Sequence, residues 1–313
     1  MILTVTMNPS VDISYALENL KINTVNRVSD VRKEAGGKGL NVSRVLKQAD
    51  EDVLATGLVG GVLGTYIREH LDTLNIRHHF QPISMESRNC IAILHEGFQT
   101  EILESGPVVS ASEQDNFLNL YSRLLDKADI VIISGSLPVG IPKYFYHELV
   151  TLSQRKNKKV LLDCTGICLS SALSGSAVPY LIKPNKEEFE KLTGESLEIY
   201  SVKSFINIVN TDEKLRTIPW IVVSLGKDGA FAKVNDEYFR VTVPEIRAVN
   251  PVGSGDSTIA GLAIGLKNHE PAEAILKRAM TFGMLNAIEP QTGFIDLSKY
   301  DELVDHVTLY REM

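Results

Sequence analysis

The chain has 313 residues, of which 44% are hydrophobic and 23% charged, the composition of an ordinary globular protein with a large core. A formal net charge of −7 argues against nucleic-acid binding, although a few local cations can still attract a small anion. No apolar run approaches the length of a membrane span, and the N-terminus lacks the features of a signal peptide, so we expect a cytoplasmic protein with no membrane contact. The only cysteines are Cys90, Cys164 and Cys168, and we expect them to be free thiols.

Short apolar runs alternate with amphipathic stretches along most of the chain. Several runs, such as IVIIS at 130–134, are continuously apolar, which is typical of parallel strands covered on both faces. The alternation predicts an α/β fold, a layered core around a mainly parallel sheet. Strands are predicted at residues 2–6, 53–59, 129–134, 160–163, 180–183 and 220–224, and helices at 39–49, 64–74, 112–126, 143–156 and 185–192.

Residues 11–34 and 86–104 depart from this alternation. They contain short alternating stretches, CIAILH and TEILE among them, with no helix between, and we interpret them as antiparallel hairpins. Together they are expected to form a small β-sheet lid, discontinuous in sequence, over a core domain of residues 1–10, 35–85 and 105–313. The C-terminal third is predicted to be helical at 255–268, 272–288 and 300–309.

The polar and glycine-rich segments follow the predicted strands. SGSLP, DCTG, KPNKEE and SLGKDG each come directly after an apolar run. Because ligands of open α/β sheets bind at the carboxyl ends of the strands, one edge of the sheet is expected to carry the chemistry.

The motif NPVGSGDS at 250–257 precedes an apolar helix. Gly253 and Gly255 allow several backbone N–H groups to converge at the positive end of that helix, which predicts an anion hole. A carboxylate is not needed to bind an anion, so Asp256 suggests a general base that accepts the proton of an attacking hydroxyl. The alternative is that Asp256 caps the helix, and the segment alone does not decide between the two roles.

The segment AGGKGLN at 35–41 is also glycine-rich and runs into a helix. It is not a Walker loop, because Gly39 follows Lys38 where such a loop has serine or threonine. The alternative to a ligand-binding role is a loop that only starts a helix.

Asn185 and Glu188 lie three residues apart, on one face of a predicted helix. An amide oxygen and a carboxylate suit hydrated Mg²⁺, although a solvated helix start is the commoner meaning of such a pair. Arg27 and Arg88, one in each lid segment, could form a cationic clamp with Lys38 for a sugar phosphate, or could simply be solvated. Asp12 could accept hydrogen bonds from sugar hydroxyls.

GGKGLN, SGSLP, KPNKEE, SLGKDGA and NPVGSGDSTIAG, in this order, resemble the signatures of the ribokinase-like PfkB carbohydrate kinase family over essentially the whole chain. The resemblance implies an α/β core with a β-sheet lid and the use of Mg²⁺ and ATP. It implies catalytic roles for Asp256, Gly253, Ser254 and Gly255, and sugar contacts for Asp12, Gly37, Lys38, Asn41 and Arg88, with Arg27 and Ser136 near the sugar phosphate. It further implies a metal site at Asn185 and Glu188 and a nucleotide site lined by Lys183, Asn185, Ser224, Gly226, Gly229 and Asn286.

Within the family, MNPSVD, RNCIAI and NPVGSGDS look most like the branch that phosphorylates tagatose 6-phosphate in lactose and galactose catabolism, with 1-phosphofructokinases as near neighbours. Many members have Asp-Thr where this chain has Asn250-Pro251, so the acidic residue beside a monovalent-cation site is missing. The free edges of the lid predict a homodimer joined through the lid. A binding protein that has lost catalysis is the competing class, and the intact Asp256, Gly253 and Gly255 argue against it.

Overall fold

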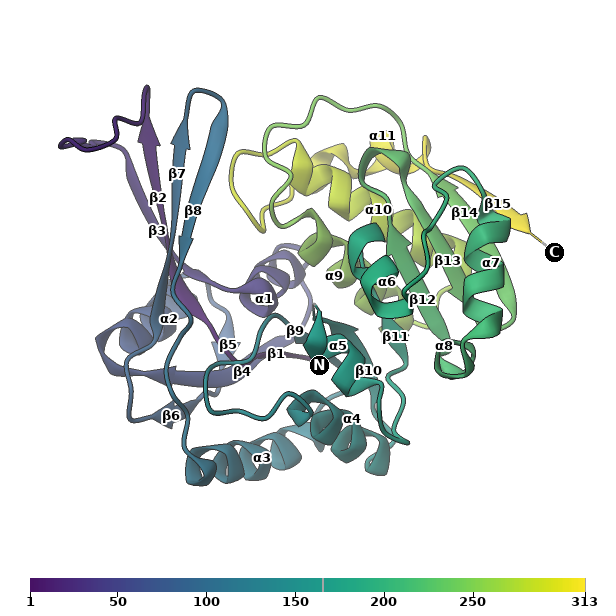
Figure 1. The fold of residues 1–313 in the computed structure, drawn as a ribbon, viewed down its shortest axis with the longest axis horizontal. Coiled ribbons are helices and arrows are strands. Elements are labelled where there is room, and N and C mark those ends of the chain that lie inside the picture. Colours follow the sequence, from purple (N-terminus) through teal and green to yellow (C-terminus); the bar gives the residue numbers. More distant parts are fainter. Residues whose placement is uncertain (165, 313) are drawn as a thin grey trace.

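The computed structural model describes residues 1–164 and 166–312, which form a large sheet between two layers of helices and a second, smaller sheet (Figure 1). The large sheet has the order β15 (Thr308–Glu312), β14 (Glu237–Thr242), β13 (Ala230–Val234), β12 (Trp220–Ser224), β11 (Leu181–Ile182), β10 (Lys159–Asp163), β9 (Ile130–Ser134), β1 (Ile2–Thr6), β4 (Val53–Gly60) and β5 (Arg77–His78), and β6 (Gln81–Ile83) also pairs with β4. The helices are α1 (Lys38–Gln48), α2 (Gly61–Thr73), α3 (Ala111–Leu125), α4 (Phe145–Arg155), α5 (Ile167–Ala172), α6 (Lys186–Thr193), α7 (Val202–Thr211), α8 (Glu213–Thr217), α9 (Ser254–Lys267), α10 (Ala272–Ala287) and α11 (Tyr300–Val304), with short 3₁₀ turns η1 (Gly226–Asp228) and η2 (Leu297–Lys299).

Six neighbouring strands of the large sheet, β4, β1, β9, β10, β11 and β12, are parallel and buried on both faces. Successive residues of β9 alternate between two hydrophobic clusters, as the two-residue period of a strand requires. Ile130 and Ile132 pack on the side of α1, α9 and α10, whereas Val131 and Ile133 pack on the side of α3, α4 and α7. The predicted three-layer α/β core with a mainly parallel sheet is confirmed.

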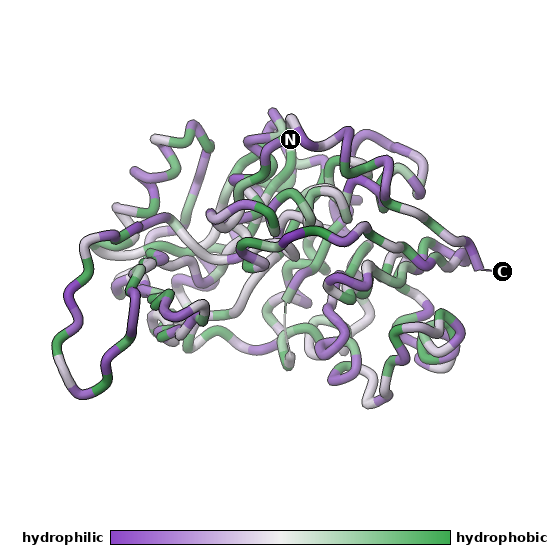
Figure 2. Tube along the Cα trace, turned by 90° about the horizontal axis from the view of Figure 1, so that it is seen from above, coloured by the Kyte–Doolittle hydropathy of each residue, from purple (hydrophilic) through white to green (hydrophobic). Residues whose placement is uncertain are grey.

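The small sheet has the order β3 (Val31–Gly36), β2 (Ser10–Leu17), β7 (Arg88–His95) and β8 (Phe98–Leu103). It brings together two segments that are far apart in the sequence, as expected, and it rises beside the core in Figure 1. The β2–β3 and β7–β8 pairs are antiparallel, but β2 and β7 are parallel, so the sheet is not built from antiparallel pairs alone. Figure 2 shows the chain from above, with hydrophobic and hydrophilic residues mixed along the tube.

The prediction of a helix over 300–309 was wrong at its end. Helix α11 stops at Val304, and Thr308–Glu312 forms a strand that pairs with β14. The strands β13 and β14, which extend the sheet with an antiparallel hairpin, were also not predicted. Within the part of the chain that the structure describes, no helix is long and apolar enough to cross a membrane.

Candidate active site

A cavity of about 750 Å³ opens where the carboxyl ends of β1, β9, β10, β11 and β12 meet, between the small sheet and the start of α9. A polar residue or a glycine at the end of each strand lines the cavity: Thr6 in β1, Gly135 after β9, Asp163 in β10, Lys183 after β11 and Ser224 in β12. The cavity brings together most of the predicted site residues: Asp12, Gly37, Lys38, Asn41, Arg88, Ser136, Lys183, Asn185, Glu188, Ser224, Gly253, Gly255 and Asp256.

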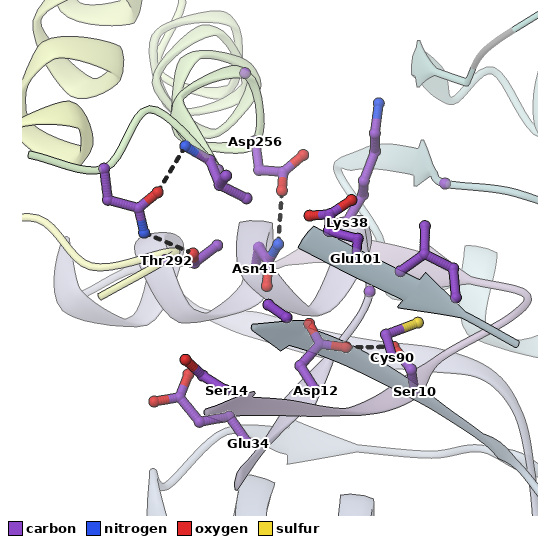
Figure 3. Close-up of a pocket in the computed structure, with 18 of the residues that line it drawn as sticks. Ser10, Asp12, Ser14, Glu34, Lys38, Asn41, Cys90, Glu101, Asp256 and Thr292 are labelled. Atoms are coloured by element: carbon purple, nitrogen blue, oxygen red, sulfur yellow. Dashed lines mark hydrogen bonds between the residues drawn. The ribbon is translucent and has the colours of Figure 1, made fainter. Parts of the chain in front are cut away.

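Asp256 lies in the first turn of α9 and is 5% exposed. Its Oδ2 atom accepts a hydrogen bond of 2.7 Å from Nδ2 of Asn41 (Figure 3). The helix begins after Gly253, which has a φ of 86° and makes no side-chain cap, so Asp256 is not the N-cap residue. The carboxylate is therefore directed across the cavity toward α1 and is free for a chemical role.

Three backbone N–H groups at the start of α9 have no acceptor in the described parts of the chain, those of Gly253, Gly255 and Asp256. They lie at the positive end of a helix of 14 residues, the arrangement that binds anions. A Cβ atom on Gly255 would lie 3.1 Å from Nζ of Lys183, so a side chain there would crowd the lysine. The helix start of α9 is thus suited to an anion.

The electrostatics of Asp256 depend on a residue that the sequence analysis did not single out. Burial and the negative charge of Asp163 raise the pKa of Asp256 to about 6, while Lys38, the Asn41 hydrogen bond and Lys183 act in the opposite direction. A base with a pKa near 6 is ionised at neutral pH and still basic enough to accept a proton.

Asp163 stands at the end of β10 and is 2% exposed. Its Oδ1 atom lies 3.5 Å from Nζ of Lys183 and 3.8 Å from Nζ of Lys38. Burial alone would raise the pKa of Asp163, but the two ammonium groups outweigh it and lower that pKa; in return Asp163 raises the pKa of Lys38. The only signal in the sequence was the position of DCTG directly after a buried strand.

The small sheet contributes Asp12 and Arg88. Asp12 accepts a hydrogen bond of 2.6 Å from Ser10, and burial raises its pKa (Figure 3). Its carboxylate fills the space where a side chain on Gly36 would stand, 1.9 Å from the position of such a Cβ, so glycine is required there. Arg88 donates from Nε to Asn8 O at 3.2 Å and from Nη1 to Glu104 O at 2.8 Å, which holds the guanidinium at the cavity wall.

Five predicted site residues do not line the cavity: Arg27, Ser254, Gly226, Gly229 and Asn286. Arg27 is exposed in the loop between β2 and β3, so the three-residue clamp is not assembled within one chain. Asn286 is fully buried behind the anion hole, where it donates to Val252 O at 2.8 Å and accepts from Gly293 N at 2.8 Å. Gly226 and Gly229 form the turn after β12, beyond Ser224.

Asn185 and Glu188 form a capping box at the start of α6, in which each side chain accepts from the other's backbone N–H at 2.9 Å. The helix-start interpretation is therefore correct for this pair. It does not exclude a metal, because Oε1 of Glu188 accepts no hydrogen bond from the described residues and the pair lines the cavity. One carboxylate with an amide oxygen fits Mg²⁺, which keeps several waters and takes its other ligands from phosphates.

Asn250 stands where the family resemblance led us to expect an acidic residue. Its Nδ2 donates to Pro290 O and to Thr292 Oγ1, both at 3.2 Å, and its Oδ1 accepts from Val252 N at 3.0 Å. As a neutral amide, Asn250 offers one uncharged oxygen, already bonded to Val252 N, where a carboxylate would offer a negative charge to a monovalent cation.

A parallel α/β sheet with a glycine-rich helix start and a buried carboxylate at its carboxyl edge, beside a separate small sheet, is the architecture of the ribokinase-like sugar kinases. The sequence profile of the pfkB family carbohydrate kinases matches residues 5–299. The chain therefore belongs to the pfkB family of carbohydrate kinases. It is a phosphotransferase with an alcohol group as acceptor, and the sugar kinases of this family use ATP.

Solved structures agree with this assignment. The chain is similar to a candidate phosphofructokinase from Staphylococcus aureus, with 30% identity, 100% of this chain and 99% of that chain covered, and a TM-score of 0.86. It is also similar to a candidate 1-phosphofructokinase from Thermotoga maritima, with 27% identity, both chains covered to 100%, and a TM-score of 0.89. Phosphofructokinase-2 from Escherichia coli in complex with potassium shares the fold, with 22% identity, 97% and 98% coverage, and a TM-score of 0.88.

Proposed function

We propose that this kinase transfers the γ-phosphoryl group of ATP to the free primary hydroxyl of tagatose 6-phosphate, which forms tagatose 1,6-bisphosphate. The observation that carries the proposal is the buried Asp256 carboxylate, held by Asn41 at a helix start where three N–H groups have no acceptor among the described residues. Cationic side chains, Arg88 and Lys38, line the same cavity and suit an acceptor that already carries a phosphate.

In the proposed reaction Asp256 accepts the proton of the attacking hydroxyl as the O–P bond forms. The N–H groups of Gly253 and Gly255 stabilise the negative charge that develops on the transferred group and the leaving phosphate. Lys183 and Lys38 add positive charge at the same edge. Asn185 and Glu188 would hold Mg²⁺, which neutralises phosphate charge when bound.

Two further statements belong to this proposal. The small sheet is proposed to be both a lid over the sugar and the interface of a homodimer, because Phe98 and Ile102 on β8 are 71% and 55% exposed and Ile22 in the β2–β3 loop is 81% exposed. The cytoplasm is the proposed location, since ATP and phosphorylated sugars are found there and the cysteines are free.

The second candidate acceptor is fructose 1-phosphate, which the similarity to the Thermotoga protein favours. A comparison of kcat/KM for tagatose 6-phosphate, fructose 6-phosphate and fructose 1-phosphate tests the proposal. We expect tagatose 6-phosphate to be the best substrate, fructose 6-phosphate weaker and fructose 1-phosphate poor. A preference for fructose 1-phosphate would make the enzyme a 1-phosphofructokinase, and the absence of ATP consumption with all three would favour a binding protein.

A further inference from the structure

Arg44 is a buried cation on α1 that the proposed reaction does not use. The residue is buried, with 5% of its surface exposed to solvent. The guanidinium donates to Ala35 O at the end of β3, to Thr292 O at 3.2 Å, and from Nη2 to Oδ1 of Asn41 at 2.5 Å. The nearest carboxylate, Oε2 of Glu34, is 3.9 Å from Nη2.

Asn41 links this cation to Asp256. The amide has two chemically different ends, an oxygen that accepts and a nitrogen that donates. In the structure the oxygen faces Arg44 and the nitrogen faces Oδ2 of Asp256, at 2.7 Å. Turning the amide over would place its oxygen against a carboxylate and its N–H groups against a guanidinium, so both contacts would become repulsive.

We infer that Arg44 is a positioning residue for the reaction, which acts through Asn41. It fixes the amide so that Nδ2 always donates to one oxygen of Asp256 and leaves the other oxygen free for the substrate hydroxyl. This inference rests on the proposed role of Asp256 as the general base. It assigns to Arg44 no contact with the substrate.

A role limited to packing explains this residue poorly. Nε of Arg44 is buried without a partner in the described residues, and an unsatisfied buried donor is costly. Burial also lowers the pKa of Arg44, with the charge of Glu34 acting in the opposite direction. An apolar side chain of similar volume would avoid both costs but could not hold the Asn41 oxygen.

A double-mutant cycle of Arg44→Met and Asn41→Ala tests the inference. Either substitution alone should lower kcat about ten- to a hundredfold, the effect of one charge-assisted hydrogen bond. If Arg44 acts through Asn41, adding Arg44→Met to the Asn41→Ala enzyme should change kcat less than about twofold, because strongly coupled residues are not additive. Effects that multiply would overturn the inference.

The pH profile provides a second readout. The titratable groups near Asp256 are Asp163, Lys38 and Lys183, and those near Arg44 are Glu34, Asp12, His70 and Asp256. The Asn41 hydrogen bond lowers the pKa of Asp256, so its loss in Arg44→Met should move the acid limb of kcat to higher pH. An acid limb that does not move would contradict the positioning role.

Lys233 provides the matched control, because it is also a buried cation, 4% exposed, and donates to Arg216 O and Ile218 O outside the cavity. Lys233→Met should lower the melting temperature but leave kcat and its pH profile unchanged.

If Arg44→Met does not fold, Arg44→Lys replaces it in the same double-mutant cycle with the same criteria. Lysine keeps the charge of Arg44 but lacks the several N–H donors of its guanidinium. Asp256→Asn, assayed in parallel, separates the inference about Arg44 from the proposed role of Asp256. An active Asp256→Asn enzyme would refute Asp256 as the general base. An inactive Asp256→Asn enzyme, together with Arg44 and Asn41 effects that multiply, would refute only the inference about Arg44.

Discussion

Asp256 concentrates the chemistry proposed for this kinase in one carboxylate. It is buried, it is not a helix cap, and its Oδ2 atom is oriented by Asn41. We expect Asp256→Asn to lower kcat about 10²–10⁴-fold, the usual contribution of a general base. Binding of the sugar phosphate, measured by calorimetry, should change little. A variant that keeps more than about a tenth of wild-type kcat would remove Asp256 from the role of base.

The raised pKa of Asp256 predicts how activity depends on pH. Because the base works only when ionised, kcat/KM should be level above pH 7 and fall as the pH drops through about 6, the pKa of Asp256. Asp163 contributes to this raised pKa through its negative charge. Asp163→Asn should therefore move the acid limb to lower pH. Asp126→Asn, which removes another lysine-paired carboxylate outside the cavity, is the control and should leave the profile unchanged.

Arg88 and Arg27 allow the sugar-phosphate clamp to be dissected. Arg88 lines the cavity, so Arg88→Ala should raise KM for the sugar phosphate about ten- to a hundredfold and KM for ATP much less. Arg27 is exposed outside the cavity, and within a single chain Arg27→Ala should have no such effect. If Arg27→Ala also raises KM for the sugar phosphate, Arg27 must reach the cavity of a second chain. If Arg88→Ala raises KM for ATP alone, the sugar phosphate and ATP occupy the opposite ends of the cavity from those proposed.

Among the helices and strands, the start of α9 is the element on which the proposed reaction depends most. Gly253 has a left-handed φ of 86°, and a Cβ atom there would lie 2.7 Å from Cγ2 of Thr292. Gly253→Ala should therefore strain the backbone and displace the N–H groups of the anion hole. We expect kcat to fall about 10²-fold or more, since loss of one oxyanion donor has that effect. Gly97→Ala, also at positive φ but with open space around it, is the control and should affect stability but not kcat.

The strands of the small sheet are proposed to determine how the whole molecule associates in solution. All six residues of β8 are exposed, Phe98 and Ile102 among them, so the strand leaves an apolar surface and a free edge uncovered. Light scattering should give twice the mass of one chain for the wild type. Phe98→Glu together with Ile102→Glu should yield monomers, whereas Val62→Glu, an equally exposed position outside the lid, should not. A wild-type monomer at assay concentration would refute the lid-mediated dimer.

Local patterns determined most of the architecture. Continuous apolar runs predicted β1, β9 and β12 to within a residue, because a strand covered on both faces has no other pattern. The glycine-rich loops also identified the cavity edge, since phosphate-binding amides require glycine at special backbone angles. The end of the chain was misjudged because TLYRE becomes a strand only through its pairing with β14, a partner more than sixty residues away.

Only the tertiary structure decided which polar residues act together. Asn41 and Asp256 are 215 positions apart, and no local pattern could show that they share a hydrogen bond. Asp163 appeared ordinary in sequence because its importance arises from burial and from Lys183, which follows another strand. Arg44 appeared ordinary because it is buried and because its backbone partners, Ala35 and Thr292, lie outside its helix. The sequence by itself determined the fold, the family signature and most of the cavity lining, which depend on short-range periodicity and backbone freedom. The pKa of Asp256, the orientation of the Asn41 amide and the place of Arg27 outside the cavity depend on distances that exist only in the folded chain.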